Sequence, residues 1–266
     1  MDSDSRFSIS KWYLDCIADE GETFVGYAAT LRWKALSLEY SSALGKRGTG
    51  PVEMKTSLHP GLLPSEAVGY VHWNCPALDI DGIWQSLERP ILRTVLAGSP
   101  TPLIWSGVQP RAWAEVDAGS LGKFSGYGYV DHIEMTAVPW QLPLEELRWG
   151  RFLSASDSII WMNFKGPFPE SVAFHNGALC TRTQISDTEI VLGDQGLRLT
   201  FKDTQVLREG ALVSTALSAI PGVDKLLPAR MLNTHECKWR SRGVLTKNDA
   251  IKSEGWTIHE VVRWPA

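Results

Sequence analysis

The sequence lacks the features that would place it with nucleic-acid-binding or integral membrane proteins. Its 266 residues carry a formal net charge of −4, and no run of like charges stands out, so we expect no nucleic-acid groove. No apolar run reaches the roughly 18 residues that a membrane-spanning helix needs. Residues 1–10 are polar and acidic, without the apolar core of a secretory signal, so we expect a cytoplasmic location.

Cysteine and histidine are sparse and show no metal-binding spacing. No Cys-x-x-Cys pair occurs, and the histidines show neither His-x-His nor His-x-x-x-His spacing. The cysteines are Cys16, Cys75, Cys180 and Cys237. No glycine-rich loop has the ending of a phosphate-binding loop, and no Gly-x-Ser-x-Gly elbow is present. We therefore expect buried, reduced thiols, no metal ion and no cofactor.

Tryptophan, in contrast, is abundant, with 12 residues. Each indole supplies a large, rigid, apolar surface, which serves a protein core or the wall of a cavity equally well. The excess therefore favours an aromatic-lined cavity without excluding a tryptophan-rich core.

Short runs rich in valine, isoleucine, threonine and aromatic residues dominate the chain, separated by glycine, proline, aspartate and serine. This pattern predicts an all-β protein built from antiparallel barrels or sandwiches. The predicted strands cover residues 11–17, 23–35, 67–74, 102–107, 111–117, 126–135, 151–155, 158–165, 171–175, 178–186, 189–192, 197–203, 205–209, 236–245 and 255–263. We expect short helices at 80–87, 144–147 and 224–232, and a long loop over 41–65.

The segment 117–122 consists of small and turn-forming residues, so it is a candidate boundary between two domains. We expect one domain over residues 8–118 and a second over 122–266. A weak internal repeat supports two related halves. An aromatic residue precedes an aspartate by two positions in both Tyr13-Leu14-Asp15 and Tyr129-Val130-Asp131.

The densest cluster of functional side chains lies in Gly126-Tyr127-Gly128-Tyr129-Val130-Asp131-His132-Ile133-Glu134. In a strand, side chains alternate between faces, so Tyr127, Tyr129 and Asp131 share one face while His132 and Glu134 share the other. A carboxyl group on an aromatic face is costly unless it is paired or protonated. A carboxylic acid kept neutral by such surroundings can serve as a proton donor.

Three motifs resemble the hydroxyneurosporene synthase (carotenoid 1,2-hydratase) family, which is related to AttH-like lipocalin domains. Lys11-Trp12-Tyr13-Leu14-Asp15, followed by an acidic-glycine turn, is similar to the family's opening. Gly126-x-Gly128-Tyr129-x-Asp131 resembles its Gly-x-Gly-Tyr-x-Asp signature. Trp105-x-x-x-x-Pro110-Arg111-Ala112 resembles its Trp-x-x-x-x-Pro-Arg-Ala segment.

The resemblance implies two lipocalin-like β-domains packed together, with acid-catalysed addition of water to an isoprenoid double bond. Related two-barrel proteins also catalyse cyclisations. The chain departs from the family pattern in two segments: Leu103 stands where the family has histidine, and His132-Ile133-Glu134 stands where it has asparagine and glycine. These departures leave the substrate and the reaction open.

Asp131 is the leading candidate for the general acid, with Asp15 and Glu260 as further candidates. Asp15 is a second acid or a structural partner of Asp131, and Glu260 lies among apolar neighbours on a predicted strand. Each has a structural alternative. Asp131 could bind backbone amides or an arginine such as Arg148 or Arg151, and Glu260 could form a salt bridge that closes a barrel.

A hydrophobic small-molecule substrate would need aromatic walls that tolerate a carbocation. The candidates are Trp105, Tyr129, Tyr127, Trp73, His132, Trp149 and Trp161. The sequence is also compatible with a carrier that performs no chemistry, and with an enzyme that closes a polyene by preorganising it.

Overall fold

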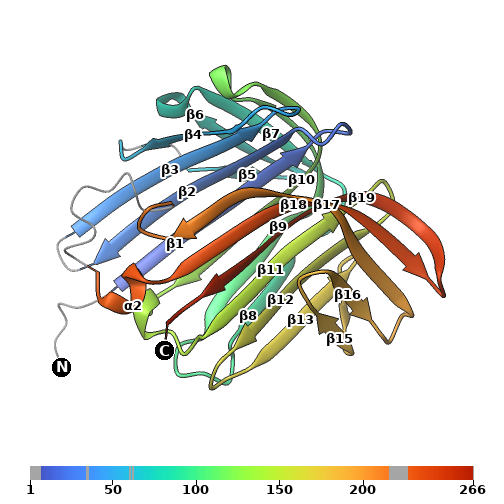
Figure 1. Cartoon of the computed structure of the whole chain (residues 1–266). Coiled ribbons are helices and arrows are strands. Elements are labelled where there is room, and N and C mark those ends of the chain that lie inside the picture. The colour runs from blue at the N-terminus through green and yellow to red at the C-terminus, as the bar shows by residue number, and fades with distance from the viewer. Residues whose placement is uncertain (1–6, 34–35, 60, 62, 216–226, 266) are drawn as a thin grey trace. The chain divides into compact units, whose positions relative to one another are not determined.

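Most of the chain forms two antiparallel sheets, one in each of two compact units, Met1–Gln141 and Leu142–Ala266 (Figure 1). A computed structural model describes residues 7–33, 36–59, 61, 63–215 and 227–265. Of the helices in these ranges, none has the length and the apolar character that crossing a bilayer requires.

The first unit contains a ten-stranded sheet with the order β4-β3-β2-β1-β10-β9-β7-β6-β5, and β8 also pairs with β9. The strands are β1 (Phe7–Ile17), β2 (Thr23–Trp33), β3 (Leu36–Lys46), β4 (Val52–Ser57), β5 (Ser65–Ala67), β6 (Tyr70–Cys75), β7 (Ile80–Ser86), β8 (Ile91–Val95), β9 (Leu103–Asp117) and β10 (Lys123–Met135). The first and last long strands of the unit, β1 and β10, are thus neighbours at the centre of the sheet (Figure 1).

One face of this sheet carries the main hydrophobic core of the first unit. Leu14 and Cys16 of β1 and Val130 of β10 alternate inward with residues of the neighbouring strands. Trp73 and Trp84 are both fully buried in this core. The tryptophans of β6 and β7 therefore serve packing.

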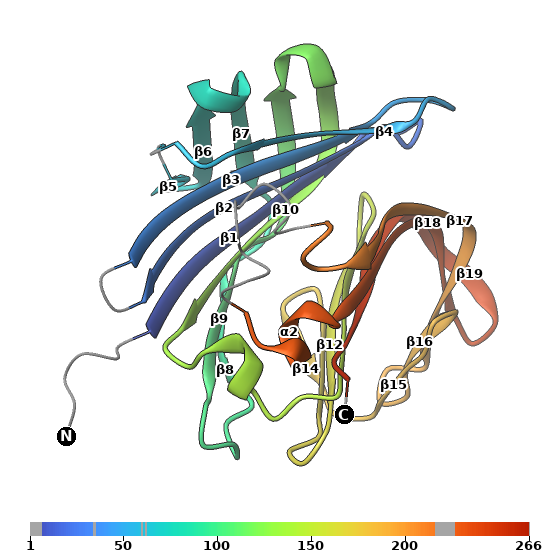
Figure 2. The same ribbon diagram turned by 60° about the vertical axis from the view of Figure 1, so that its left-hand side comes forward.

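The second unit contains a nine-stranded sheet with the order β14-β13-β12-β11-β19-β18-β17-β16-β15. The strands are β11 (Glu146–Leu153), β12 (Ser158–Lys165), β13 (Glu170–His175), β14 (Ala178–Cys180), β15 (Thr183–Ile185), β16 (Glu189–Leu192), β17 (Leu197–Ala211), β18 (His235–Lys247) and β19 (Ala250–Arg263). Figure 2 shows how strongly this sheet curls. Its two ends approach each other, since Ser171 Oγ of β13 lies 3.1 Å from Thr183 Oγ1 of β15, and the sheet nearly closes into a barrel.

The all-β prediction is confirmed, but most of the predicted helices and the predicted loop are wrong. Residues 80–87 fall almost entirely in β7, whose buried residues alternate with exposed ones at the period of a strand. Within 41–65 the chain continues β3 and forms β4 and the start of β5. Residues 144–147 contain no helix, and β11 begins there at Glu146.

The third predicted helix, 224–232, corresponds in part to the short helix α2 (Ala229–Leu232), which follows Pro228. Residues 224–226 lie outside the described residues. Proline ends or begins helices because it lacks the N–H group that an interior position donates, so its position marks the start of this helix.

The chain divides between Gln141 and Leu142, whereas composition suggested a boundary at 117–122. Residues 118–122 connect β9 to β10, which pair with each other over most of their length. Small, turn-forming residues occur in hairpin turns as well as in linkers, so composition alone does not distinguish the two.

Gly126 and Gly128, which the sequence marks as a motif, allow β10 to approach its neighbours closely. A Cβ atom at Gly126 would collide with the carbonyl group of Ile17 in the adjacent strand. At Gly128 it would lie 2.5 Å from the carbonyl oxygen of Asp15 and 2.8 Å from Trp84 Cδ1. Because the obstructing atoms are largely backbone, the neighbours cannot move aside without disturbing the sheet.

We predict that Gly126→Ala lowers the free energy of unfolding by about 2 kcal/mol, the scale of overpacking in a rigid site. Gly98→Ala is the matched control, since no atom lies within 4 Å of a Cβ placed there. Urea denaturation followed by circular dichroism measures both. Equal stabilities of the two variants would show that β10 is not constrained at Gly126.

Candidate functional site

The first unit contains a buried cluster in which one carboxylate oxygen accepts two side-chain hydrogen bonds. Asp131 is only 3% exposed. Its Oδ2 accepts a hydrogen bond from the Tyr129 hydroxyl at 2.9 Å and one from Trp105 Nε1 at 3.2 Å. Tyr129 and Trp105 are both fully buried. The three residues that the sequence ranks first for acid chemistry and for the aromatic wall are therefore in direct contact.

Strand geometry explains how these three side chains meet. Tyr129 and Asp131 lie two residues apart on β10, so they share a face. Asp131 pairs with Gly107 of β9, two residues beyond Trp105. Between Gly107 and Ala112 of β9 the register with β10 shifts twice, so this part of β9 is bulged. Pro110 lies within the bulged part. Proline has no N–H group to donate to a ladder, so it is suited to such a bulge.

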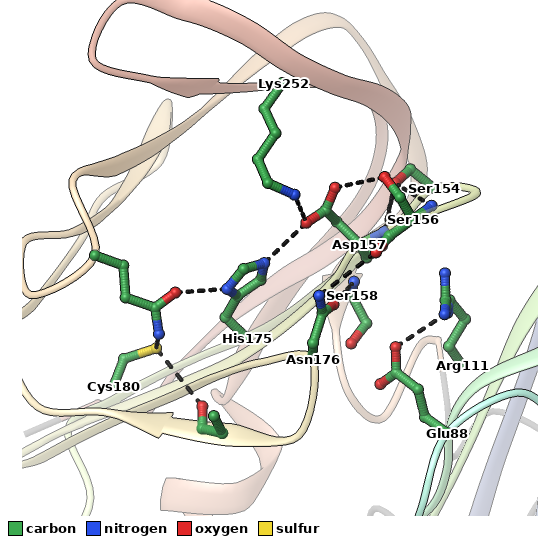
Figure 3. A network of polar contacts seen from close by, with 12 residues as sticks. Glu88, Arg111, Ser154, Ser156, Asp157, Ser158, His175, Asn176, Cys180 and Lys252 are labelled. Atoms are coloured by element: carbon green, nitrogen blue, oxygen red, sulfur yellow. Dashed lines mark hydrogen bonds and ion pairs between the residues drawn. The ribbon is translucent and has the colours of Figure 1, made fainter.

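The remaining residues of the Trp-x-x-x-x-Pro-Arg-Ala segment have structural roles. Arg111 Nε lies 3.0 Å from Glu88 Oε1 in an ion pair that is largely shielded from solvent (Figure 3). Ala112 is fully buried in the core of the first unit. The segment thus supplies one residue of the cluster and the packing that holds its strand in place.

Asp15, a second acid, lies next to this cluster. It is fully buried and pairs with Tyr129 across β1 and β10. Burial raises the pKa of Tyr129 well above its usual value, and the charge of Asp131, the hydrogen bond to it and the charge of Asp15 act in the same direction. The hydrogen bond with Trp105 opposes them. Tyr129 therefore keeps its proton and remains a hydrogen-bond donor.

Two further tyrosines, Tyr13 and Tyr27, extend the aromatic surroundings. The Tyr13 ring lies 6.0 Å from the Tyr129 ring and 5.4 Å from the Tyr27 ring, measured between centroids. Lys11 Nζ lies 5.3 Å from the centroid of the Tyr27 ring. Tyr13 and Asp15 lie two residues apart on β1 and therefore share a face, and Tyr13 pairs with Tyr27 of β2.

Other predicted site residues of the first unit lie elsewhere. Trp73 belongs to the core, where it closely approaches Gly26. His132 lies on the opposite face of β10 from Asp131 and stacks on Trp12 at 4.5 Å, with its Nε2 2.7 Å from Ser10 Oγ. Burial lowers the pKa of His132, so the imidazole is neutral at neutral pH. Neither residue reaches the Asp131 cluster.

Tyr127 lies on β10 and pairs with Trp113 of β9, and the second unit holds Glu260, Trp149 and Trp161. Glu260 forms an ion pair with Lys238, whose ammonium group lies 5.2 Å from the centroid of a Trp149 ring. This salt bridge joins β18 and β19, which are neighbours in the middle of the sheet, so it does not close the barrel. Trp161 belongs to the barrel core and stacks on Phe201 at 5.7 Å. Glu260 and Trp149 thus belong to one charged and aromatic cluster, and Trp161 to the core.

Phe201 also contacts His259, a buried imidazole that is not among the predicted site residues. Their ring centroids lie 4.5 Å apart, and the Trp239 ring stacks on His259 at 5.2 Å. Burial, reinforced by the charges of Lys238 and Arg148, lowers the pKa of His259 to about 3. The ring is therefore neutral and serves as part of an aromatic stack.

A second polar cluster surrounds Asp157, in the turn between β11 and β12 (Figure 3). Its Oδ1 accepts a hydrogen bond from His175 Nε2 at 2.9 Å and forms an ion pair with Lys252, and its Oδ2 accepts one from Ser156 Oγ at 2.7 Å. His175 Nδ1 lies 2.5 Å from Gln195 Oε1. These residues come from four separate stretches of the second unit, so no local motif could have revealed them.

This cluster is better suited to holding the barrel together than to nucleophilic chemistry. Gln195 Nε2 lies 3.4 Å from Cys180 Sγ, and the thiol in turn donates to the Ala178 carbonyl oxygen at 3.7 Å. Burial, with a further contribution from Asp194, raises the pKa of Cys180 to about 11, and a protonated thiol is a poor nucleophile. Among the residues with described positions, no three His, Cys, Asp or Glu side chains are placed to hold a metal ion.

The fold is shared with several solved structures. A putative AttH (NE1406) from Nitrosomonas europaea aligns with a TM-score of 0.57 and 11% identity, over 98% of this chain and 93% of its own. Kievitone hydratase from Nectria haematococca aligns with a TM-score of 0.54 and 13% identity, over 96% of this chain and 88% of its own. CghA aligns with a TM-score of 0.58 and 12% identity, over 97% of this chain and 88% of its own. Neither a protein-family model nor a curated protein sequence matches the chain.

These similarities confirm the resemblance to AttH-like proteins at the level of the fold. The solved structures include a hydratase by name, and CghA was also solved with Sch210972. At such low identity the alignment carries no residue roles from one chain to the other, so the site rests on the contacts within this chain.

The Asp157 cluster predicts a pH-dependent contribution to stability. Burial alone would raise the pKa of Asp157, but contacts with His175, Lys252, Ser156 and Ser253 outweigh it and hold the pKa well below its usual value. A carboxyl group whose pKa is lower in the folded state than in the unfolded state stabilises the fold at pH values above its unfolded pKa, which is near 4. This stabilisation is lost as the pH falls through the folded-state pKa.

We therefore predict that Asp157→Asn lowers the free energy of unfolding at neutral pH by about 2 kcal/mol, and that the deficit shrinks as the pH falls below about 4. Urea denaturation across this pH range measures the effect. The control is Glu254→Gln, which removes an exposed ion pair with Arg242 and should cost less than about 1 kcal/mol. A deficit independent of pH would show that the Asp157 charge does not stabilise the barrel.

Proposed function

We propose that the protein is a cofactor-independent hydratase or cyclase that protonates a double bond of a hydrophobic isoprenoid or polyene, with Asp131 as the general acid. The observation that carries this proposal is the buried contact of Asp131 with Tyr129 and Trp105. It places a carboxyl group among aromatic rings, as protonation of an unactivated alkene requires.

The geometry suits Asp131 to proton donation from a defined atom. Because Oδ2 already accepts hydrogen bonds from the Tyr129 hydroxyl and Trp105 Nε1, the acidic proton belongs on Oδ1. Burial disfavours charge, and the neighbouring carboxyl group of Asp15 disfavours a second negative charge in the same region. Asp15 therefore supports the acid form of Asp131.

The aromatic rings would stabilise the cation that protonation produces. The proton from Asp131 Oδ1 forms a new C–H bond, and the alkene is left with a carbocation. Each desolvated aromatic face near such a cation contributes up to about 2 kcal/mol, and Trp105, Tyr129 and Tyr13 supply rings here.

Two outcomes then complete the reaction. In hydration, water adds to the cation and its surplus proton returns to the Asp131 carboxylate. In cyclisation, a second double bond of the substrate attacks the cation, and loss of a proton to Asp131 restores the acid. Both routes regenerate the enzyme without a cofactor, and which one occurs depends on whether water reaches the cation.

The comparisons support an enzyme acting on a small molecule. Kievitone hydratase shares the fold over almost the whole chain and is a hydratase by name, and CghA was solved with Sch210972. An isoprenoid or polyene substrate is the part of the proposal that rests on the motif resemblance and on the aromatic surroundings of Asp131.

A second function, preorganisation of a ligand without proton transfer, has a specific observation in its favour. Two hydrogen-bond donors on Asp131 Oδ2 stabilise the carboxylate as well as orienting the acid. The histidine that the resembled family carries is replaced by Leu103, which is buried. An ionised Asp131 would leave the cluster able to bind and fold a polyene, or to carry it, without protonating it.

We predict that wild-type protein incubated with linear isoprenoids in heavy water yields a product with one carbon-bound deuterium, detected by mass spectrometry. Asp131→Asn should lower this incorporation by at least about a hundredfold, the scale of losing a general acid. The amide is nearly isosteric and still presents an oxygen to Tyr129 and Trp105, so the fold should survive.

Asp81→Asn is the control for the loss of a carboxylate, because Asp81 is exposed and pairs with His72. It should leave deuterium incorporation unchanged. Full activity in folded Asp131→Asn would refute the acid role. An unlabelled isomer would support closure by preorganisation, and recovery of unaltered ligand would support a carrier.

A further inference from the structure

A row of aromatic side chains continues from the Asp131 cluster along the same face of β10. Tyr127 lies two residues before Tyr129, so strand alternation places it on that face. Tyr127 pairs with Trp113 of β9, and the two rings meet edge to face, with centroids 5.5 Å apart and planes at 88°. This Trp113–Tyr127 pair is the next aromatic contact beyond the cluster.

Exposure increases along this row. Asp131 is 3% exposed and Tyr129 is fully buried, whereas Trp113 is 36% exposed. Ile83 of β7 is 41% exposed, and its partner Glu115 lies two residues from Trp113. Ile83 and Trp113 are therefore diagonal neighbours on one face. The face leads from a buried carboxyl group to an accessible apolar surface.

The Trp113 side chain is positioned by its neighbour but remains partly exposed to solvent. The edge-to-face contact with Tyr127 restricts the Trp113 ring, while a large part of the indole remains in contact with solvent. Trp113 and Ile83 form a contiguous exposed apolar patch, and contiguous patches, unlike isolated apolar side chains, mark binding surfaces. Burying these groups against an apolar ligand would release the ordered water that they now contact.

The shape of this surface favours a chain-like ligand over a protein partner. Gln85 pairs with Trp113, and Glu115 pairs with Ile83, and both polar residues are exposed. The apolar strip is therefore narrow and bordered by polar groups. A single extended hydrocarbon chain fits such a strip, whereas a stable protein interface buries about 800 Å² on each partner.

We propose that Trp113, Tyr127 and Ile83 form a distal subsite that binds the remote apolar end of the substrate whose double bond lies at Asp131. This inference rests on the proposed function. Tyr127 and Asp131 are four residues apart on one strand, which corresponds to roughly 13 Å. The substrate class is therefore an elongated isoprenoid or polyene, long enough to contact both sites, and Trp113 determines length specificity.

Isothermal titration calorimetry with geraniol, farnesol and geranylgeraniol tests the subsite, because these alcohols differ by one isoprene unit at each step. In the wild type, affinity should rise with length. Trp113→Ala should weaken geranylgeraniol binding by about tenfold, as truncating an aromatic anchor does, and geraniol binding by less than about twofold. The matched control is Leu92→Ala, which removes an exposed apolar side chain of β8 and should change no affinity.

Two results would overturn the subsite: a wild type that binds no alcohol or shows no length dependence, and a Trp113→Ala variant that loses equal affinity for all three. The deuterium assay judges the proposed function separately. Length-dependent binding without deuterium transfer would refute only the acid chemistry. Deuterium transfer to geraniol and geranylgeraniol with equal affinities would refute only the subsite.

Discussion

The two hydrogen bonds that converge on Asp131 Oδ2 are the constraint on which the arrangement of the first unit depends. A carboxyl group buried on an aromatic face is costly unless donors surround it. Tyr129 comes from the same strand and Trp105 from the next, so both donors are present only when β9 and β10 hold their observed register. The bulged stretch around Pro110 allows that register to change between the cluster and the rest of β9.

The two glycines of the Gly-x-Gly-Tyr-x-Asp motif lie on the opposite face of β10 from Asp131, and they allow the close strand packing that holds the Asp131 contacts in place. Gly126 and Gly128 let the strand lie against Ile17, Asp15 and Trp84, and the Trp84 indole donates to the Asp15 carbonyl at 2.7 Å. The glycines provide close strand packing, while the tyrosine and aspartate that follow provide the buried polar contact. A motif of this kind is therefore partly a packing requirement and partly a candidate site.

In the second unit, the buried carboxylate of Asp157 is compensated by charged and polar partners. Asp157 is surrounded by His175, Lys252 and Ser156, which offset its charge directly, and the network continues through Gln195 toward the closing edge of the barrel. Such compensation stabilises the ionised carboxylate and suits a structural clamp. The Asp131 contacts are with neutral aromatic donors, which orient the carboxyl group without cancelling its charge. The two clusters differ in this respect: the Asp157 contacts compensate a charge, whereas the Asp131 contacts suit the acid role that we propose.

Local sequence patterns determined the all-β character, most of the long strands, and the shared strand face of Tyr129 and Asp131, because each depends only on alternation between neighbouring residues. Tertiary structure decided what alternation cannot encode. Residues 80–87 became a strand because the sheet buries alternate residues of β7. Asp157 binds Lys252, which lies 95 residues away in the sequence, and the edge-to-face contact of Trp113 with Tyr127 depends on the register between β9 and β10. Contacts between distant segments depend on strand order and register, and these are set by the packing of the whole sheet.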